Sequence, residues 1–378
     1  MSGSRLSYTA AAGALVVGTL LTGCANERIT ELDLSPDTPA AQAALTTAAP
    51  DAAAAPSIAP GPPVQNGLIA ARAYVDQTRQ SSAIFTLPAD GSTIHQLTQP
   101  PGLARDDHPD WSPDATSIVF DRATPDSPSR IWSVDAAGSS AHQLPQLCQA
   151  GAADCLNEDE REPSYSPDGK MIALSRQWGT IDPQSNQIQY SDVFLMNSDG
   201  TNAQRLTFLT NDKPYSGHVG NPSWSPDGKR LAFEYRTSAT ANPANGTAIF
   251  VINADGTGLQ QLTPWDLRAG DRPGWSPDGT RILFTTYPAG PEFTPGGGIY
   301  TVHPDGSTIT ALTPAPSDIF YGVASFSPDG QSIVYAQSRP GGSADLYTMK
   351  ADGTAATQVV TSSDHWVSRA DWAPAVGS

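Results

Sequence analysis

The sequence has few cations and few cysteines, and each shortage excludes a class of protein or site. It contains 21 lysines and arginines against 38 aspartates and glutamates, a formal net charge of −17, and no long basic run. Nucleic-acid binding needs clustered lysine and arginine to displace counterions from phosphates, so this class is excluded. Outside Cys24 only Cys148 and Cys155 remain, and no further cysteine or nearby histidine completes a metal site around them.

Long apolar runs are also scarce, and the one near the N-terminus, Ala10 to Leu21, is too short to span a bilayer comfortably. It follows Arg5 and has the length of the apolar region of a signal peptide. It ends in Leu21-Thr22-Gly23-Cys24, which resembles a bacterial lipobox and implies lipidation of Cys24. An ordinary secretory signal with a chance cysteine is the alternative. We expect residues 1–24 to be a lipoprotein signal peptide, and the mature protein to be extracytoplasmic and lipid-anchored to the cell membrane, in the periplasm or on the outer face of the cytoplasmic membrane.

Residues 25–65 lack large apolar side chains and are rich in alanine, proline and threonine. Such a segment cannot bury enough apolar surface to offset the entropy lost on ordering, so we expect a disordered tether. Export also implies an oxidising compartment, in which two nearby cysteines form a disulfide by default. We therefore expect a Cys148–Cys155 disulfide, and a metal-binding pair is the alternative.

Helical periodicity is absent as well, and a motif of an aromatic residue and a tight turn returns along the chain instead. Its copy at Trp224 to Gly228 reads Trp-Ser-Pro-Asp-Gly, in which proline, aspartate and glycine each favour a turn. The motif aromatics are Trp111, Tyr165, Trp224, Trp275, Phe326 and, in a degenerate copy, Trp372. They lie 46 to 59 residues apart, so the chain is an internal repeat, and the repeat decides the fold.

Each repeat has room for four short strands. Behind the turn come an apolar run such as residues 282–284, a third strand such as 299–300, a second turn, and a fourth strand that in most copies ends in Leu-Thr. The apolar runs have no polar face, so we expect neighbouring sheets to cover both of their sides. Four strands per repeat of about 50 residues predict an all-β fold, a β-propeller of four-stranded antiparallel blades over residues 66–374.

The number of strands predicts six blades and a closed ring. The first repeat lacks an aromatic strand ahead of it, and the last aromatic strand, around Trp372, has nothing after it. If the C-terminal strand pairs into the first blade, the ring closes and two exposed sheet edges disappear. Deleting residues 366–378 should then unfold the domain or make it aggregate.

The Trp-Ser-Pro-Asp-Gly turn, the third strand and the Asp-Gly to Leu-Thr ending together resemble the TolB-like propeller repeat, a WD-like bacterial family. The resemblance covers residues 66–374 and implies a six-bladed propeller exported from the cytoplasm and used for binding protein partners. This chain has a lipobox and a tether where TolB has a folded N-terminal domain, so only the binding role carries over. Related propellers that gate oligopeptidases precede a hydrolase domain, but this sequence has no Gly-x-Ser-x-Gly elbow.

The connections expected on one face of the propeller are long and irregular, which is typical of a binding face on a rigid scaffold. The residue three positions before each motif aromatic should enter the inner strand from that face and surround the mouth of the channel. We call these the channel-mouth residues: His108, Glu162, Asn221, Arg272, Val323 and Arg369. The polar ones suit a peptide terminus, a carboxylate or a sugar. Alternatively, they only solvate the channel and pair with each other.

We therefore expect a monomeric, non-catalytic binding or scaffold protein, without cofactor or metal, whose partner is an envelope protein or peptide. Two alternatives stay open. One is a cell-wall glycan receptor, in which exposed aromatic rings stack on the sugar; the candidates are Trp178, Tyr215, Trp265 and Phe293, which could instead cover a peptide or simply cap blade edges. The other is a metal-dependent polysaccharide lyase, because some related propellers cleave acidic sugars with channel histidines; it requires His108 and either His218 or His365 to converge near Glu162.

Overall fold

The computed structural model describes residues 66–76, 78–146, 158–181, 188–210, 217–237, 246–287, 297–315, 318–339, 344–360 and 367–374. Within these residues the regular structure is β, apart from a 3-10 turn at Trp265–Leu267 (η2). The all-β expectation is therefore confirmed for the described part of the chain. No helix in these segments has the length and apolar character needed to cross a membrane.

Four sheets each contain four strands in sequential antiparallel order. Their bounds are β8 Asp159–Tyr165, β9 Met171–Ile181, β10 Ile188–Asn197, β11 Gln204–Arg205; β12 Gly217–Trp224, β13 Arg230–Thr237, β14 Thr247–Asn253, β15 Gln260–Gln261; β16 Ala269–Trp275, β17 Ile282–Thr286, β18 Ile299–Val302, β19 Thr310–Ala311; and β20 Phe320–Phe326, β21 Ser332–Ser338, β22 Ala344–Lys350, β23 Thr357–Val360. These sheets confirm the expected four-strand unit.

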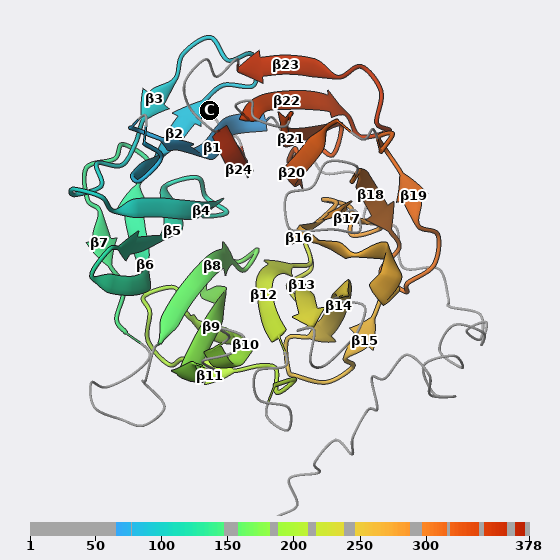
Figure 1. The fold of residues 1–378 in the computed structure, drawn as a ribbon, viewed down its shortest axis with the longest axis horizontal. Helices are drawn as coiled ribbons and strands as arrows, with labels where there is room; N and C mark the ends of the chain where they lie inside the picture. The colour runs from blue at the N-terminus through green and yellow to red at the C-terminus, as the bar shows by residue number, and fades with distance from the viewer. Residues whose placement is uncertain are drawn as a thin grey trace, which may run out of the picture. The chain divides into compact units, whose positions relative to one another are not determined.

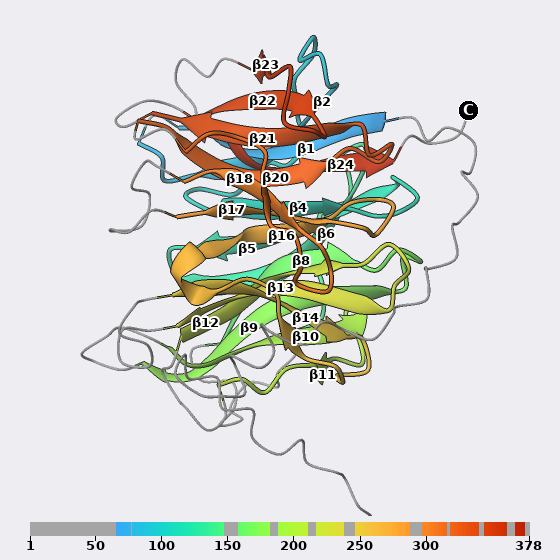
Figure 2. The ribbon, with the colours of Figure 1, turned by 90° about the vertical axis from the view of Figure 1, so that its right-hand side faces the viewer.

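A fifth sheet contains eight strands, which fall into two four-strand halves. One half has the order β24-β1-β2-β3 and the other β4-β5-β6-β7, and a single parallel bridge between Ser82 and Arg105 joins them. The bounds are β1 Asn66–Tyr74, β2 Ser82–Leu87, β3 His95–Gln96, β4 Arg105–Trp111, β5 Ser117–Thr124, β6 Ser127–Asp135, β7 His142–Gln143 and β24 Val367–Pro374. Figure 1 shows these groups of strands arranged around a common centre, with β4, β8, β12, β16, β20 and β24 innermost, and Figure 2 shows the groups from the side.

The repeated Ser-Pro-Asp-Gly turn is held by its own side chains. In the copy after Trp224, the Ser225 hydroxyl donates to Asp227 Oδ1 at 2.6 Å and accepts the Arg230 N–H at 2.9 Å. Gly228 has a φ of 68°, a conformation that glycine adopts without steric cost. The same serine contacts recur in the turns that start at Ser112, Ser166, Ser276 and Ser327. The motif therefore specifies the link between the first two strands of a unit.

The Leu-Thr ending terminates the short fourth strand. The Thr263 hydroxyl oxygen accepts the N–H of Ile249 at 2.9 Å, so the side chain takes the place of the next ladder hydrogen bond. Thr98, Thr207 and Thr313 make the same contact with the third strands of their own units. The leucine before the threonine is buried, as at Leu262 with 5% exposure. In these four units the dipeptide thus both packs and caps the outer edge.

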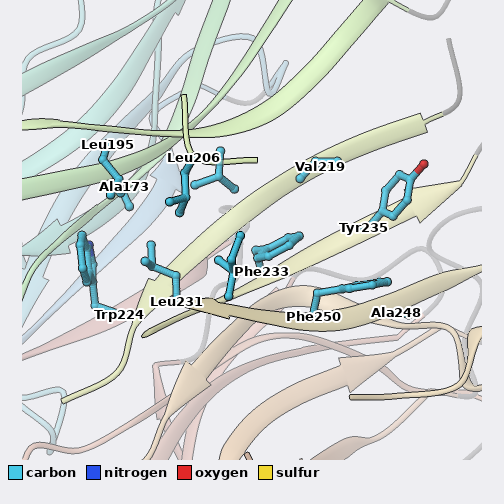
Figure 3. Packing of buried hydrophobic residues seen from close by; sticks show 12 residues of the cluster. Ala173, Leu195, Leu206, Val219, Trp224, Leu231, Phe233, Tyr235, Ala248 and Phe250 are labelled. Carbon is cyan, nitrogen blue, oxygen red and sulfur yellow. The ribbon is translucent and has the colours of Figure 1, made fainter. Parts of the chain in front are cut away.

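Hydrophobic clusters lie between consecutive groups of strands. In the cluster of Figure 3, Leu231 and Phe233 of β13 pack with Leu195 of β10 from the preceding sheet. The intervening residue of β13, Ala232, belongs to another cluster, with Phe284 of the following sheet. The expectation that both sides of the apolar runs are covered is therefore confirmed. Equivalent pairs in the other clusters are Ile69 with Leu346, Ile84 with Phe120, Ile131 with Leu174, and Leu283 with Tyr335.

The C-terminal strand β24 pairs antiparallel with β1, from Asn66 opposite Pro374 to Ala73 opposite Val367. Trp372 is 6% exposed, packs in a cluster with Ile69, and donates from its indole N–H to Gly67 O at 3.1 Å. The first and last described strands of the chain are thus neighbours, as the unmatched aromatic strand predicts.

Several sequence predictions fall outside the described residues. These are the signal peptide with Cys24, the tether, the Cys148–Cys155 disulfide, Tyr215, Phe293 and His365. The strand that carries Arg369 is described, but its side chain is not. Two other predictions need correction. Trp178 is not an exposed platform but a core residue with 7% exposure, packed edge-on against Phe194, and Trp265 packs against Tyr235 and Phe250. The Trp178 ring lies in the hydrophobic interior, where its large apolar area is more stable than in water, whereas the Trp265 ring is only partly buried against its cluster.

Candidate binding site

The channel-mouth residues occupy a bulge in the innermost strands. His108, Glu162, Asn221 and Arg272 have φ values of 51°, 58°, 54° and 58°, in the left-handed region that residues with a side chain rarely adopt. The pairing register shifts at the same place, as between Asp107 and Asp110 in β4. A proline follows each of these four residues and disfavours the right-handed helical conformation there. The bulge changes the direction in which the four side chains point, and such bulges are common beside binding sites.

His108 joins two carboxylates from different sheets. Its Nδ1 lies 2.5 Å from Asp121 Oδ1, and its Nε2 lies 3.8 Å from Glu162 Oε1. Asp121 also accepts the Glu162 N–H at 3.1 Å and the Ser129 hydroxyl at 2.9 Å. His108 and Glu162 are 4% and 9% exposed. The network therefore ties β4 and β5 to β8 in a region that excludes most water.

The same pattern continues from Glu162 to the next sheet. Glu162 Oε2 accepts the Ser175 hydroxyl and the Asn221 N–H, both at 2.7 Å. The Asn221 amide donates to Glu234 Oε2 at 3.3 Å, and Glu234 in turn accepts the Asp271 N–H at 2.7 Å. A carboxylate of one sheet thus repeatedly holds the bulge of the next. These contacts order the inner strands as one polar layer.

His218 lies beside Glu162, and Gly220 makes the approach possible. A side chain at Gly220 would collide with Glu162 Oε2 and with the His218 ring, whose Nε2 would be 3.0 Å from its Cβ. Burial lowers the pKa of His218. Burial alone would raise the pKa of Glu162, but His218, His108 and the hydrogen bonds from Ser175 and Asn221 hold it at about 2. Glu162 is therefore ionised at neutral pH.

Arg272 makes a separate ion cluster with two aspartates. Its Nη2 donates to Asp110 Oδ1, and its Nη1 donates to Pro109 O at 3.0 Å. Asp110 Oδ2 accepts the Tyr165 N–H at 2.7 Å, and Asp371 Oδ2 accepts the Trp111 N–H at 3.0 Å. In Figure 1, β16 and β4 lie on opposite sides of the common centre, so the Arg272 side chain spans it. One guanidinium thus faces two carboxylates from β4 and β24.

The pKa of Asp110 is raised to about 7. The main cause is burial away from water, and the second is the negative charge of Asp371. The folded state therefore keeps a proton that the unfolded chain releases near pH 4, and stability is lost as pH rises through this interval. We expect Asp110 to lower the free energy of unfolding by on the order of 2–4 kcal/mol between about pH 4 and pH 7. Urea unfolding at several pH values should show that the unfolding free energy of Asp110→Asn decreases less with pH than that of the wild type. Asp168→Asn changes a carboxylate in an exposed turn and should keep the wild-type decrease. An unchanged decrease in Asp110→Asn would contradict this assignment.

The structure brings some predicted residues together and separates others. His108, Glu162 and Asn221 belong to one network, Arg272 belongs to another, and Val323 is buried at 2% exposure without a polar group. The prediction missed the carboxylates that hold them. Asp110 and Asp371 directly precede a motif aromatic, and Asp121 and Glu234 directly follow the phenylalanine of an apolar run. Acidic residues at these two repeat positions were the signal that could have found them.

The lyase alternative required His108 and His218 or His365 to converge near Glu162. His108 and His218 do lie beside it, and His365 is outside the described residues. Among the side chains that the structure describes, no group of three or more His, Cys, Asp and Glu residues is arranged to hold a metal ion.

Comparison with curated proteins finds partial relatives, and no family model matches the chain. An uncharacterised protein of Agrobacterium fabrum is 29% identical over 215 residues, 54% of this chain and 62% of the relative. Dipeptidyl-peptidase 5 of Porphyromonas endodontalis is 29% identical over 117 residues, 31% of this chain and 16% of the enzyme. The chain thus spans less than two thirds of the length of either relative.

Solved structures match a larger share of this chain than the curated relatives do. TolB of Acinetobacter baumannii superposes with a TM-score of 0.60 at 20% identity, over 82% of this chain and 67% of TolB. A chain of the nidogen–laminin complex gives 0.58 at 11% identity, over 81% of this chain and 98% of its own. Oligogalacturonate lyase of Vibrio parahaemolyticus gives 0.50 at 13% identity, over 78% of this chain and 80% of the lyase. These proteins and this chain therefore share one architecture, and the chain has the β-propeller fold of TolB and its structural neighbours.

Proposed function

We propose that this protein is an extracytoplasmic binding protein that holds a protein or peptide partner on one face of the propeller. The observation that carries the proposal is the bulged polar layer of His108, Glu162 and Asn221, which enters the inner strands from the face opposite the Ser-Pro-Asp-Gly turns. Binding residues usually lie at the end of a rigid scaffold, on segments that the scaffold holds in position. The fold shared with TolB supports the same role.

We further propose six blades closed into a ring by β24. The pairing of β24 with β1 and the hydrophobic clusters between consecutive groups support this arrangement. A closed ring leaves no sheet edge open to unwanted pairing, and it keeps the inner strands in register. The polar layer then has a fixed geometry before any partner arrives, which lowers the entropic cost of binding.

The N-terminal sequence supports a location at the membrane surface. In this proposal, residues 1–24 direct export, Cys24 carries the lipid anchor, residues 25–65 form the tether, and a Cys148–Cys155 disulfide holds the loop that contains it. Two or more acyl chains would make a lasting anchor, since each buried CH₂ contributes about 0.8 kcal/mol. The propeller would then meet partners in the cell envelope, protein or peptide first and cell-wall glycan as an alternative.

The proposal is tested by crosslinking from two matched positions on one sheet. A photoreactive residue would replace either Arg161, 46% exposed at the channel-mouth end, or Lys170, 80% exposed in the Ser-Pro-Asp-Gly turn. We expect a discrete crosslinked protein or peptide in intact cells from position 161 and none from position 170. Equal crosslinking from both positions, or none from either, would refute the assignment of the binding face. Crosslinks to cell-wall glycan alone would favour the glycan receptor.

A polysaccharide lyase is the second candidate, and the placement of His108 and His218 beside Glu162 favours it. It predicts that added Mn²⁺ allows cleavage of an acidic oligosaccharide, seen as ultraviolet absorbance from the new carbon–carbon double bond. Absence of cleavage across uronate-containing substrates with and without Mn²⁺ leaves the binding function as the proposal.

A further inference from the structure

Two buried polar atoms of the channel-mouth layer have no hydrogen-bond partner among the described residues, His108 Nε2 and Asn221 Oδ1. Their residues are only 4% and 6% exposed. Buried polar atoms in folded proteins almost always find a partner, so two such atoms in one network need an explanation. Both residues also contact Glu162, through the 3.8 Å approach of His108 and the 2.7 Å hydrogen bond from the Asn221 N–H. We call His108, Glu162 and Asn221 the acceptor cluster.

The distance between His108 Nε2 and Glu162 Oε1 suits a bridging donor. At 3.8 Å the two atoms are too far apart for a direct hydrogen bond, but one donor group placed about 2.8 Å from each would bridge them. The short contact of Nδ1 with Asp121 assigns the ring proton to Nδ1. In the neutral ring, Nε2 therefore offers a lone pair.

With His108 neutral, the two atoms that lack a partner, His108 Nε2 and Asn221 Oδ1, are both acceptors, and the Glu162 carboxylate lies beside them. Asn221 donates one amide N–H to Glu234, its Oδ1 has no partner, and an ionised Glu162 can only accept. The nearby guanidiniums are already paired, Arg161 with Asp159 and Arg236 with Glu234. A carboxylate, phosphate or carbonyl ligand would bring further acceptors and be repelled. A primary ammonium has three donors, no acceptor and the charge that complements Glu162.

We propose that the acceptor cluster binds a primary ammonium group of a peptide, either its free N-terminus or a lysine side chain. This inference rests on the proposed peptide-binding function and names the group that the face recognises. Asp107, with a side chain 24% exposed, and the partly exposed His218 lie beside the cluster and line the approach. The buried acceptors would select an ammonium, because a ligand without donors would leave them without hydrogen bonds, which costs binding free energy.

Calorimetric titration of the full protein tests the proposal with three probes: trialanine amide, its N-acetylated form, and Nα-acetyl-lysine amide. We expect one-to-one binding of at least one amine, and at least about tenfold weaker binding once that amine is acetylated. Binding of trialanine amide alone assigns the site to peptide N-termini, and binding of the lysine derivative alone assigns it to lysine. No binding of either amine, or equal binding of acetylated trialanine, would overturn the proposal, as would saturable binding of Mn²⁺ alone.

Variants separate recognition from folding. Glu162→Gln keeps the shape and removes the charge, so amine affinity should fall about tenfold or more, and Asn221→Ala should lower it severalfold. Asp192→Asn is the matched control, because Asp192 is also a buried carboxylate but bonds Arg205 and Thr207 away from the cluster. Unchanged affinity in a folded Glu162→Gln or Asn221→Ala protein would refute the site. If amines fail to bind while crosslinks from position 161 persist, only this inference falls.

Discussion

Deleting residues 366–378 is expected to abolish cooperative unfolding and to produce aggregation. The deletion removes β24, so β1 keeps β2 but loses its other antiparallel partner along most of its length. It removes Trp372 from the cluster with Ile69 and Leu346, and it removes the Asp371 carboxylate that accepts the Trp111 N–H. Loss of a buried tryptophan alone costs about 3–5 kcal/mol, a large fraction of the stability of a typical domain. With β2 as its one remaining partner, β1 would also present an open sheet edge.

Circular dichroism melting and light scattering of the purified protein measure this effect. The matched control is deletion of residues 375–378, which leaves β24 complete and should melt like the parent. A truncated protein that kept the full cooperative transition would show that β24 is dispensable, and the closed six-bladed ring would then be wrong.

Replacing Arg272 with alanine is expected to destabilise the protein by about 3–5 kcal/mol at pH 8. The substitution leaves Asp110 and Asp371 facing each other without the cation between them, and the Asp110 side chain is 11% exposed. Breaking one side of a buried ion pair costs more than the pair contributes, because the remaining charge stays in a poorly hydrated place. The loss should shrink at pH 5, where Asp110 is protonated.

Denaturant unfolding of a double-mutant cycle tests the pairing. We expect Arg272→Ala with Asp110→Asn to be less destabilised than Arg272→Ala alone, since the second substitution removes the unpaired charge. Arg339→Ala serves as the control, because Arg339 and its partner Asp318 are 70% and 66% exposed, and it should change the unfolding free energy by less than about 0.5 kcal/mol. Additive effects of Arg272→Ala and Asp110→Asn would mean that the two side chains do not interact.

The fold was largely predictable because its signals are local and repeated. The turn after Trp224 depends on Ser225, Asp227 and Gly228 contacting each other within a few residues, and such contacts follow from sequence alone. The apolar run around Phe233 likewise predicted burial on both faces. The aromatic side chain of Trp178 was misjudged, because a large ring in a variable segment gives no sign of whether it lies in the core or in solvent.

The candidate site was only half predictable. Counting three residues back from each motif aromatic finds His108, Glu162, Asn221 and Arg272, because the repeat places them at the same level of the inner strands. Their partners come from other sheets: Asp121 to Glu162, Glu162 to Asn221, and Arg272 across to Asp110. No local pattern predicts such pairs, since they depend on how neighbouring sheets are placed.

The sequence by itself determined the strand units, their turns and the bulge positions of the inner strands, because these depend on contacts between residues close along the chain. Only the tertiary structure decided that Glu162 is an ionised, buried carboxylate between His108 and His218, and that Arg272 spans the centre to Asp110. Charge states and unpaired acceptors depend on desolvation and on distances between groups far apart in sequence. Those quantities exist only once the sheets have packed.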